Sequence, residues 1–148
     1  MDTTANSVPA NQPRGIVRHL PTVARVLLGL MFFAFGLMGL LNLIPPPPKE
    51  SLPAALVAFS EALMKTGYLF QLIKGTEVLV GALLLLNRFV PLALALIAPV
   101  IVNIVAVHAF LAPSGLGMAI VILGLELYLA WSYRSAFRPM LGARVTPG

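Results

Sequence analysis

The chain has 148 residues and contains no cysteine, which excludes disulfides, thiolate metal sites, iron-sulfur clusters and cysteine nucleophiles. Charged residues are also scarce: they make up 10% of the chain, whereas an ordinary soluble domain has about 25%. No GxGxxG, phosphate loop, HExxH or serine-histidine-acid pattern occurs. We therefore expect a non-catalytic role first, and the sequence assigns no catalytic and no metal-binding residue.

Apolar residues, in contrast, make up 59% of the chain. A membrane-spanning helix needs about 20 such residues, so four spans with their loops use nearly all of the chain. The composition predicts an all-α fold, a polytopic four-helix bundle in the membrane. The net charge of +5 comes from arginines near the chain ends beside apolar runs, which favours contact with the lipid bilayer and argues against a nucleic-acid partner.

The order of apolar and polar stretches divides the chain into three parts. Residues 1–20 form a polar N-terminal arm, residues 21–135 a transmembrane domain, and residues 136–148 a basic C-terminal tail. The predicted spans cover residues 23–44, 68–87, 90–111 and 116–133, and the "PPPP" at 45–48 ends the first of them. Residues 52–65 are too short and too amphipathic to span, so we expect an interfacial helix in the first outer loop.

The positions of the basic residues predict the orientation. With four spans, both termini lie on one side, and that side gathers seven of the ten Lys and Arg residues: Arg14, Arg18, Arg25, Arg88, Arg134, Arg138 and Arg144. With three spans, the two arginine-rich ends would face opposite sides, against the positive-inside tendency. We therefore expect a multi-pass protein of a bacterial-type cytoplasmic (inner) membrane, with both termini cytoplasmic.

Two local patterns predict contacts between residues. Gly29 and Gly36 are seven apart and share one face of the first span, which predicts close approach of a neighbouring helix. In the interfacial helix, Glu61 and Lys65 are four apart and are expected to pair.

Five polar residues fall inside the predicted spans. Counting about 1.5 Å per residue from the outer helix ends places Glu77, Asn103 and Glu126 at one level, roughly 13 to 17 Å deep. Lys74 and His108 come out at roughly 6 to 9 Å. Because an ionised group in lipid costs about 2.5 to 3.5 kcal/mol, these residues should face inward, toward partners. The sequence thus predicts a polar cluster, for binding or for structure, of Lys74, Glu77, Asn103, His108 and Glu126.

The roles within this cluster stay open. Lys74 and Glu77 are three apart and can pair. Glu126 can be protonated, can accept a hydrogen bond from Asn103, or can meet Lys74 or His108 across the bundle. A metal site is disfavoured because Asn103 and His108 are five apart, about 140° around a helix.

Three segments together resemble a known family. They are "RVLLGLMFFAFGLMGLL", the stretch from "TGYLFQLIKGTEVLVG" to "VNIVAVHAFLAP", and "LELYLAWSYRSAFRPML". Over residues 23–141 the chain is similar to the DoxX-like small four-helix integral membrane proteins. The resemblance implies a four-helix membrane fold and a link to quinol oxidase or thiosulfate-to-quinone electron transfer. Glu77, Asn103 and His108 match recurrent family positions, and the position of Glu77 often carries a neutral amide in the family.

The leading hypothesis is a non-catalytic accessory or scaffold subunit of a larger membrane complex, respiratory or otherwise redox-linked. Its partners are then the bilayer and other membrane subunits. The alternatives are a quinone-interacting oxidoreductase component that uses the polar cluster, and a small carrier or lipid-binding protein. No motif predicts a cofactor that is bound covalently or through ligand residues. A bound quinone or a bound lipid is an open alternative.

Overall fold

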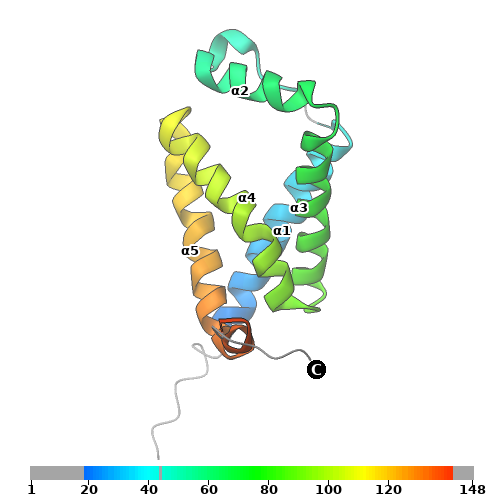
Figure 1. The fold of residues 1–148 in the computed structure, drawn as a ribbon, viewed down its shortest axis with the longest axis vertical. Helices are drawn as coiled ribbons and strands as arrows, with labels where there is room; N and C mark the ends of the chain where they lie inside the picture. Colours follow the sequence, from blue (N-terminus) through cyan, green and yellow to red (C-terminus); the bar gives the residue numbers. More distant parts are fainter. Residues whose placement is uncertain (1–18, 44, 142–148) are drawn as a thin grey trace, which may run out of the picture.

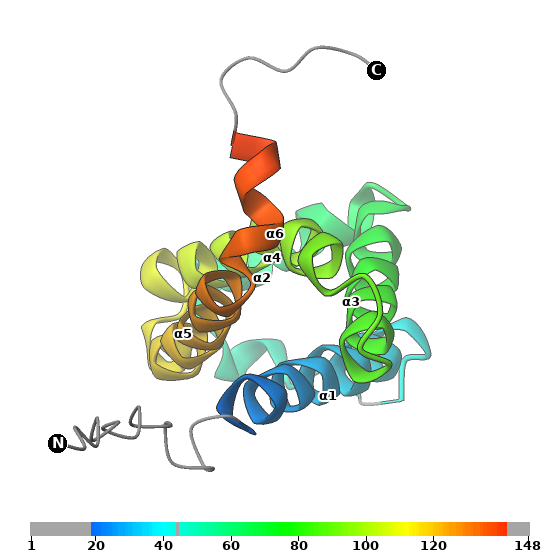
Figure 2. The same cartoon turned by 90° about the horizontal axis from the view of Figure 1, so that it is seen from below.

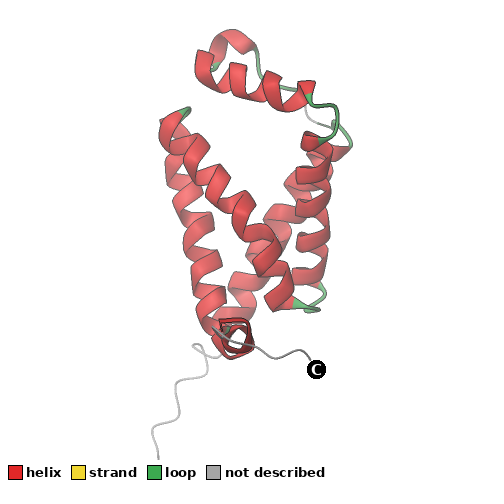
Figure 3. Cartoon of the chain, in the orientation of Figure 1, coloured by secondary structure: helices red, strands yellow, loops and turns green. Residues whose placement is uncertain are grey.

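The computed structural model describes residues 19–43 and 45–141, and this part of the chain is helical, with no strand (Figure 3). The four long helices are α1 (Leu20–Leu40), α3 (Leu69–Leu85), α4 (Val90–Phe110) and α5 (Leu116–Ser132). The shorter helices are α2 (Ala54–Lys65) and α6 (Arg134–Phe137), with the 3₁₀ turns η2 (Lys49–Ser51), η3 (Pro113–Gly115) and η4 (Arg138–Leu141).

Three segments of the described chain are long and apolar enough to cross a membrane: Leu20–Leu40, Val90–Phe110 and Pro113–Ser132. Helix α3 has 17 residues and passes the same test only together with α2, from which it is bent by 91°. The described part of the chain is thus all-helical, with three to four candidate membrane-spanning helices.

The long helices run side by side, and α2 lies across one end of them (Figure 1). Seen along their length, α1 lies between α3 and α5, and α4 lies between the same two helices (Figure 2). Helices α1 and α4 are therefore diagonal to each other, as are α3 and α5. Aliphatic and aromatic side chains from all four meet in the core: Ala24, Leu28, Phe32, Val80, Leu84, Val90, Ala93, Leu94, Ile97, Ile101 and Leu129.

The first helix differs from the predicted span of residues 23–44, since α1 begins at Leu20 and ends at Leu40. Asn42 adopts a left-handed conformation with φ 51°, and the N–H of Leu43 donates to the carbonyl of Met38 at 2.9 Å. This is the Schellman arrangement that ends many helices, so α1 stops before the proline run. Asn87, with φ 54°, ends α3 in the same way.

Two predicted segments lie partly outside the described residues. Of the N-terminal arm, residues 1–18 are not described, while Leu20 already belongs to α1. Of the C-terminal tail, α6 and η4 are described as far as Leu141, and residues 142–148 are not.

Helices α1 and α3 pack closely through glycine on both sides. A Cβ added to Gly81 would stand 2.7 Å from the Cα of Phe33, so the backbones of the two helices approach each other closely at this glycine. A Cβ on Gly29 would stand 3.1 Å from the Cβ of Leu84. The close approach predicted from Gly29 is confirmed, and it takes place against α3.

Candidate intramembrane polar site

Lys74 and Glu77 form an ion pair on the inner side of α3. The Lys74 Nζ donates to the Glu77 Oε2 at 2.8 Å, so the pairing predicted from their spacing is present. Glu77 is 4% exposed, and Lys74 is partly buried. Because removing one partner would leave the other charge in a low-dielectric environment, the two charges depend on each other.

Glycines of α1 make room for this pair. A Cβ on Gly36 would lie 2.9 Å from the Cβ of Glu77, and one on Gly39 would lie 2.8 Å from the Cδ of Lys74. The glycine face of α1 therefore fits over the charged turn of α3. This contact confirms the packing role predicted for Gly36.

His108 belongs to the last turn of α4. Its Nδ1 lies 3.2 Å from the carbonyl oxygen of Ala112, and a carbonyl can only accept, so this geometry assigns the ring hydrogen to Nδ1. In the neutral tautomer with this hydrogen, Nε2 is the acceptor. Gly115 lies against the ring, because a Cβ there would collide with the imidazole. The turn between α4 and α5 thus fixes the ring orientation.

A cavity of about 240 Å³ brings these groups from separate helices together. Lys74 and Glu77 from α3 and His108 from α4 share its wall with apolar residues of α1, α4 and α5. Its lining consists of Met31, Phe32, Phe35, Lys74, Glu77, Ile104, His108 and Ile122. The cavity therefore presents a cation, a carboxylate and an imidazole within an apolar enclosure.

The other two predicted cluster residues lie elsewhere. Glu126 of α5 is 6% exposed, and its Oε2 has no hydrogen-bond partner within the described chain. It does not line the cavity, whose α5 residue is Ile122, one turn away. Asn103 is exposed on α4 and so faces away from the other helices. The shared depth of Glu77, Asn103 and Glu126 therefore does not bring the three together.

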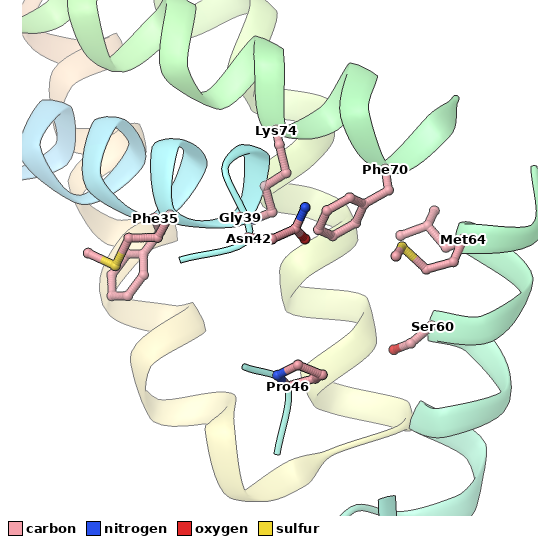
Figure 4. A pocket seen from close by; sticks show the side chains of 10 residues that line it. Phe35, Gly39, Asn42, Pro46, Ser60, Met64, Phe70 and Lys74 are labelled. Carbon is pink, nitrogen blue, oxygen red and sulfur yellow. The ribbon is translucent and has the colours of Figure 1, made fainter. Parts of the chain in front are cut away.

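A second cavity of about 420 Å³ adjoins the first at Phe35 and Lys74 (Figure 4). It opens between the end of α1, helix α2 and the start of α3. Its lining consists of Phe35, Met38, Gly39, Asn42, Pro46, Ser60, Leu63, Met64, Phe70 and Lys74. The ammonium of Lys74 lies 5.9 Å from the centre of the Phe70 ring, a cation-π distance. Lys74 thus belongs to both cavities.

The predicted pair of Glu61 and Lys65 is wrong. Glu61 pairs with Lys49, whose Nζ lies 2.5 Å from the Glu61 Oε1, because η2 folds back onto α2. The Lys49 ammonium, by its hydrogen bond and its charge, holds the pKa of Glu61 below its usual value. A contact across a turn therefore replaces the contact expected within the helix.

Arg25 has a role that the sequence did not predict. It is 7% exposed, and its Nη1 donates to the carbonyl of Leu84 in the last turn of α3. A cation at this helix end is favourable for the helix dipole. One signal was available: Arg25 precedes Gly29 by four residues, on the helix face that packs against α3.

Within the described residues, no group of three or more His, Asp or Glu side chains is placed to hold a metal ion. Comparison with protein-family models, with curated proteins and with solved structures found no match.

Proposed function

We propose that this chain is a DoxX-like membrane protein that serves as an accessory or scaffold subunit of a larger, respiratory or otherwise redox-linked complex. The observation that carries the proposal is the exposed amide of Asn103. It lies near the middle of α4, on an exposed side that also carries large apolar residues: Leu96 is 42%, Val102 63% and Phe110 83% exposed.

An amide on such a face needs a partner. In hydrocarbon, an amide without hydrogen bonds is costly, and side chains of this kind commonly bond across helix interfaces. The described helices leave Asn103 uncovered, so a helix of another subunit is the natural source of the missing bond.

The topology that we propose has four spans, with α3 as the second and α2 on the outer membrane surface. Its support is the distribution of charge. The start of α1, the loop between α3 and α4, and α6 lie at one end of the molecule (Figure 1), and they carry Arg25, Arg88 and Arg134. This end would face the cytoplasm of a bacterial-type inner membrane, following the positive-inside tendency.

Purification from native membranes in a mild detergent tests the subunit proposal. The protein should migrate with other membrane subunits on a native gel. Asn103→Leu should lower the recovery of those subunits by about 3-fold to 15-fold, the effect of one interhelical hydrogen bond. Val102→Leu, at the neighbouring exposed position, is the matched control and should leave recovery unchanged. A wild-type protein that migrates alone would refute the proposal.

A second candidate is a quinone-interacting oxidoreductase component, which the cavity at Lys74, Glu77 and His108 favours. The Lys74 ammonium would donate to a quinone carbonyl, and the His108 Nε2 would accept from a quinol hydroxyl. Since ligand pockets usually measure about 300–1,000 Å³, a cavity of about 240 Å³ would hold only the ring.

Quinol-dependent oxygen uptake by native membranes tests this candidate. Glu77→Gln and His108→Gln should both lower the uptake, whereas Gln71→Leu, on the exposed side of α3, should not. Equal uptake in all three variants would remove the candidate without affecting the subunit proposal.

A further inference from the structure

The cavity of about 420 Å³ below α2 has the dimensions and the lining of a ligand site. Its apolar wall consists of Phe35, Met38, Leu63, Met64 and Phe70. Methionine adapts its shape to an irregular ligand and makes favourable contacts with aromatic rings. Figure 4 shows the side chains of Met64 of α2 and Phe70 of α3 extending from their helices into this space. The wall therefore suits a flexible apolar chain.

The polar groups of the cavity favour an uncharged headgroup. They are the Lys74 ammonium, the Asn42 amide and the Ser60 hydroxyl, and no carboxylate lines the cavity among the described residues. The charge of Lys74 is already compensated by Glu77 at 2.8 Å. An anionic ligand would add an uncompensated negative charge near Glu77, whereas a carbonyl or a hydroxyl would take the remaining hydrogen-bonding capacity.

The cavity continues into a third one of about 540 Å³, with which it shares Pro46, Ser60 and Met64. This extension lies between the proline run and α2, and it includes Leu52 and Val57. Three charged groups lie there: Lys49 and Glu61 pair at 2.5 Å, and Lys65 is exposed. The two cavities together form a groove with a mostly apolar wall, which we call the α2 groove.

Helix α2 covers this groove without closing it. None of its residues is buried, and Met64 is 54% exposed although it lines both cavities. Helix α2 meets α3 at a bend of 91°, where Gly67 has φ 76°. The apolar side of α2 is therefore only partly covered by the described protein, and a lipid chain in the groove would complete the cover.

We propose that the α2 groove binds a neutral single-chain amphiphile of the monoacylglycerol type. Its ester carbonyl and hydroxyls lie at Lys74, Asn42 and Ser60, and its acyl chain lies beneath α2 against Leu63, Met64 and Val57. The proposal is independent of the partner subunits and of quinone.

Photocrosslinking in phosphatidylcholine nanodiscs tests the site. The probe is a monoacylglycerol whose acyl chain carries a diazirine and an alkyne, and mass spectrometry locates the labelled peptides. Label should concentrate on α2 and on the adjoining ends of α1 and α3. Monooleoylglycerol should compete at least about tenfold more effectively than oleate, whose head is anionic, or oleoyl-lysophosphatidylcholine, whose head is zwitterionic; both share its acyl chain. Equal competition by oleate would overturn the assignment of a neutral ligand.

Two variants and a matched control separate the groove from general lipid contact. Ser60→Phe fills the groove and should lower labelling at least about tenfold, whereas Ala62→Phe, exposed on the same helix and outside both cavities, should label like the wild type. Asn42→Gly keeps the left-handed backbone and removes the amide. It should weaken the binding of monooleoylglycerol about fivefold. Labelling that neither Ser60→Phe nor Asn42→Gly changes, or that spreads evenly over the apolar helices, would refute the proposal.

Discussion

Gly36 of α1 lies directly against Glu77 of α3, so closely that a Cβ on the glycine would stand 2.9 Å from the Cβ of the glutamate. The most buried charge of α3 thus lies beneath a residue without a side chain. The close packing of α1 on α3 therefore takes place directly over the internal ion pair.

Gly81→Ala should destabilise the protein by about 1 to 3 kcal/mol or more, because its new methyl group would press on the backbone of Phe33. Gly75→Ala is the control in the same helix, since nothing lies within 4 Å of the position of its Cβ. The melting temperature in detergent should fall for the first variant and stay unchanged for the second. Equal melting temperatures would show that α1 and α3 are not closely packed there.

Lys74→Met should destabilise the protein by about 3 to 5 kcal/mol, because it leaves the Glu77 carboxylate buried without its cation. The double variant Lys74→Met/Glu77→Gln removes both charges and should recover most of this loss. Unfolding in mixed micelles of increasing dodecyl sulfate content measures each free energy. Additive effects of Lys74→Met and Glu77→Gln would contradict a coupled pair.

The ion pair of Lys49 and Glu61 predicts a pH dependence of α2. Since Lys49 lowers the pKa of Glu61 from the usual 4.5, the pair favours the folded arrangement above that value and loses its effect as the pH falls through the lowered pKa. As the pH falls, the distribution of distances between spin labels at Ala62→Cys on α2 and Ala109→Cys on α4 should broaden. Because the chain has no cysteine of its own, the labels attach only there. The same broadening in a Glu61→Gln background would contradict the assignment.

Gly115→Ala should displace the His108 ring, since the added methyl group occupies the position of the imidazole. Loss of the hydrogen bond to Ala112 should expose the ring and raise its rate of modification by diethyl pyrocarbonate several-fold. Gly117→Ala, with open space at its Cβ, is the control. A His19→Gln background leaves His108 as the single reactive histidine. Unchanged rates would show that Gly115 does not hold the ring.

Patterns within single helices allowed much of the fold to be predicted. Apolar runs of about 20 residues predict α1, α4 and α5, and the three-residue spacing predicts the pair of Lys74 and Glu77. These predictions hold because helix geometry fixes the angle and rise between neighbouring residues. The early end of α1 was missed, although Asn42 carried the signal, since asparagine tolerates the left-handed conformation.

Only the tertiary structure decided which of the polar residues meet. The depth of Asn103 and Glu126 follows from counting along a helix, but the rotation of each helix about its axis depends on its neighbours. That rotation exposes Asn103, buries Glu126 away from the cavity, and places His108 on the wall of the cavity that Lys74 and Glu77 also line. In the same way, Glu61 pairs with Lys49 rather than Lys65, because the fold of the preceding loop places η2 beside α2. The sequence by itself determined the helices and their charges, and the packing between helices determined the site.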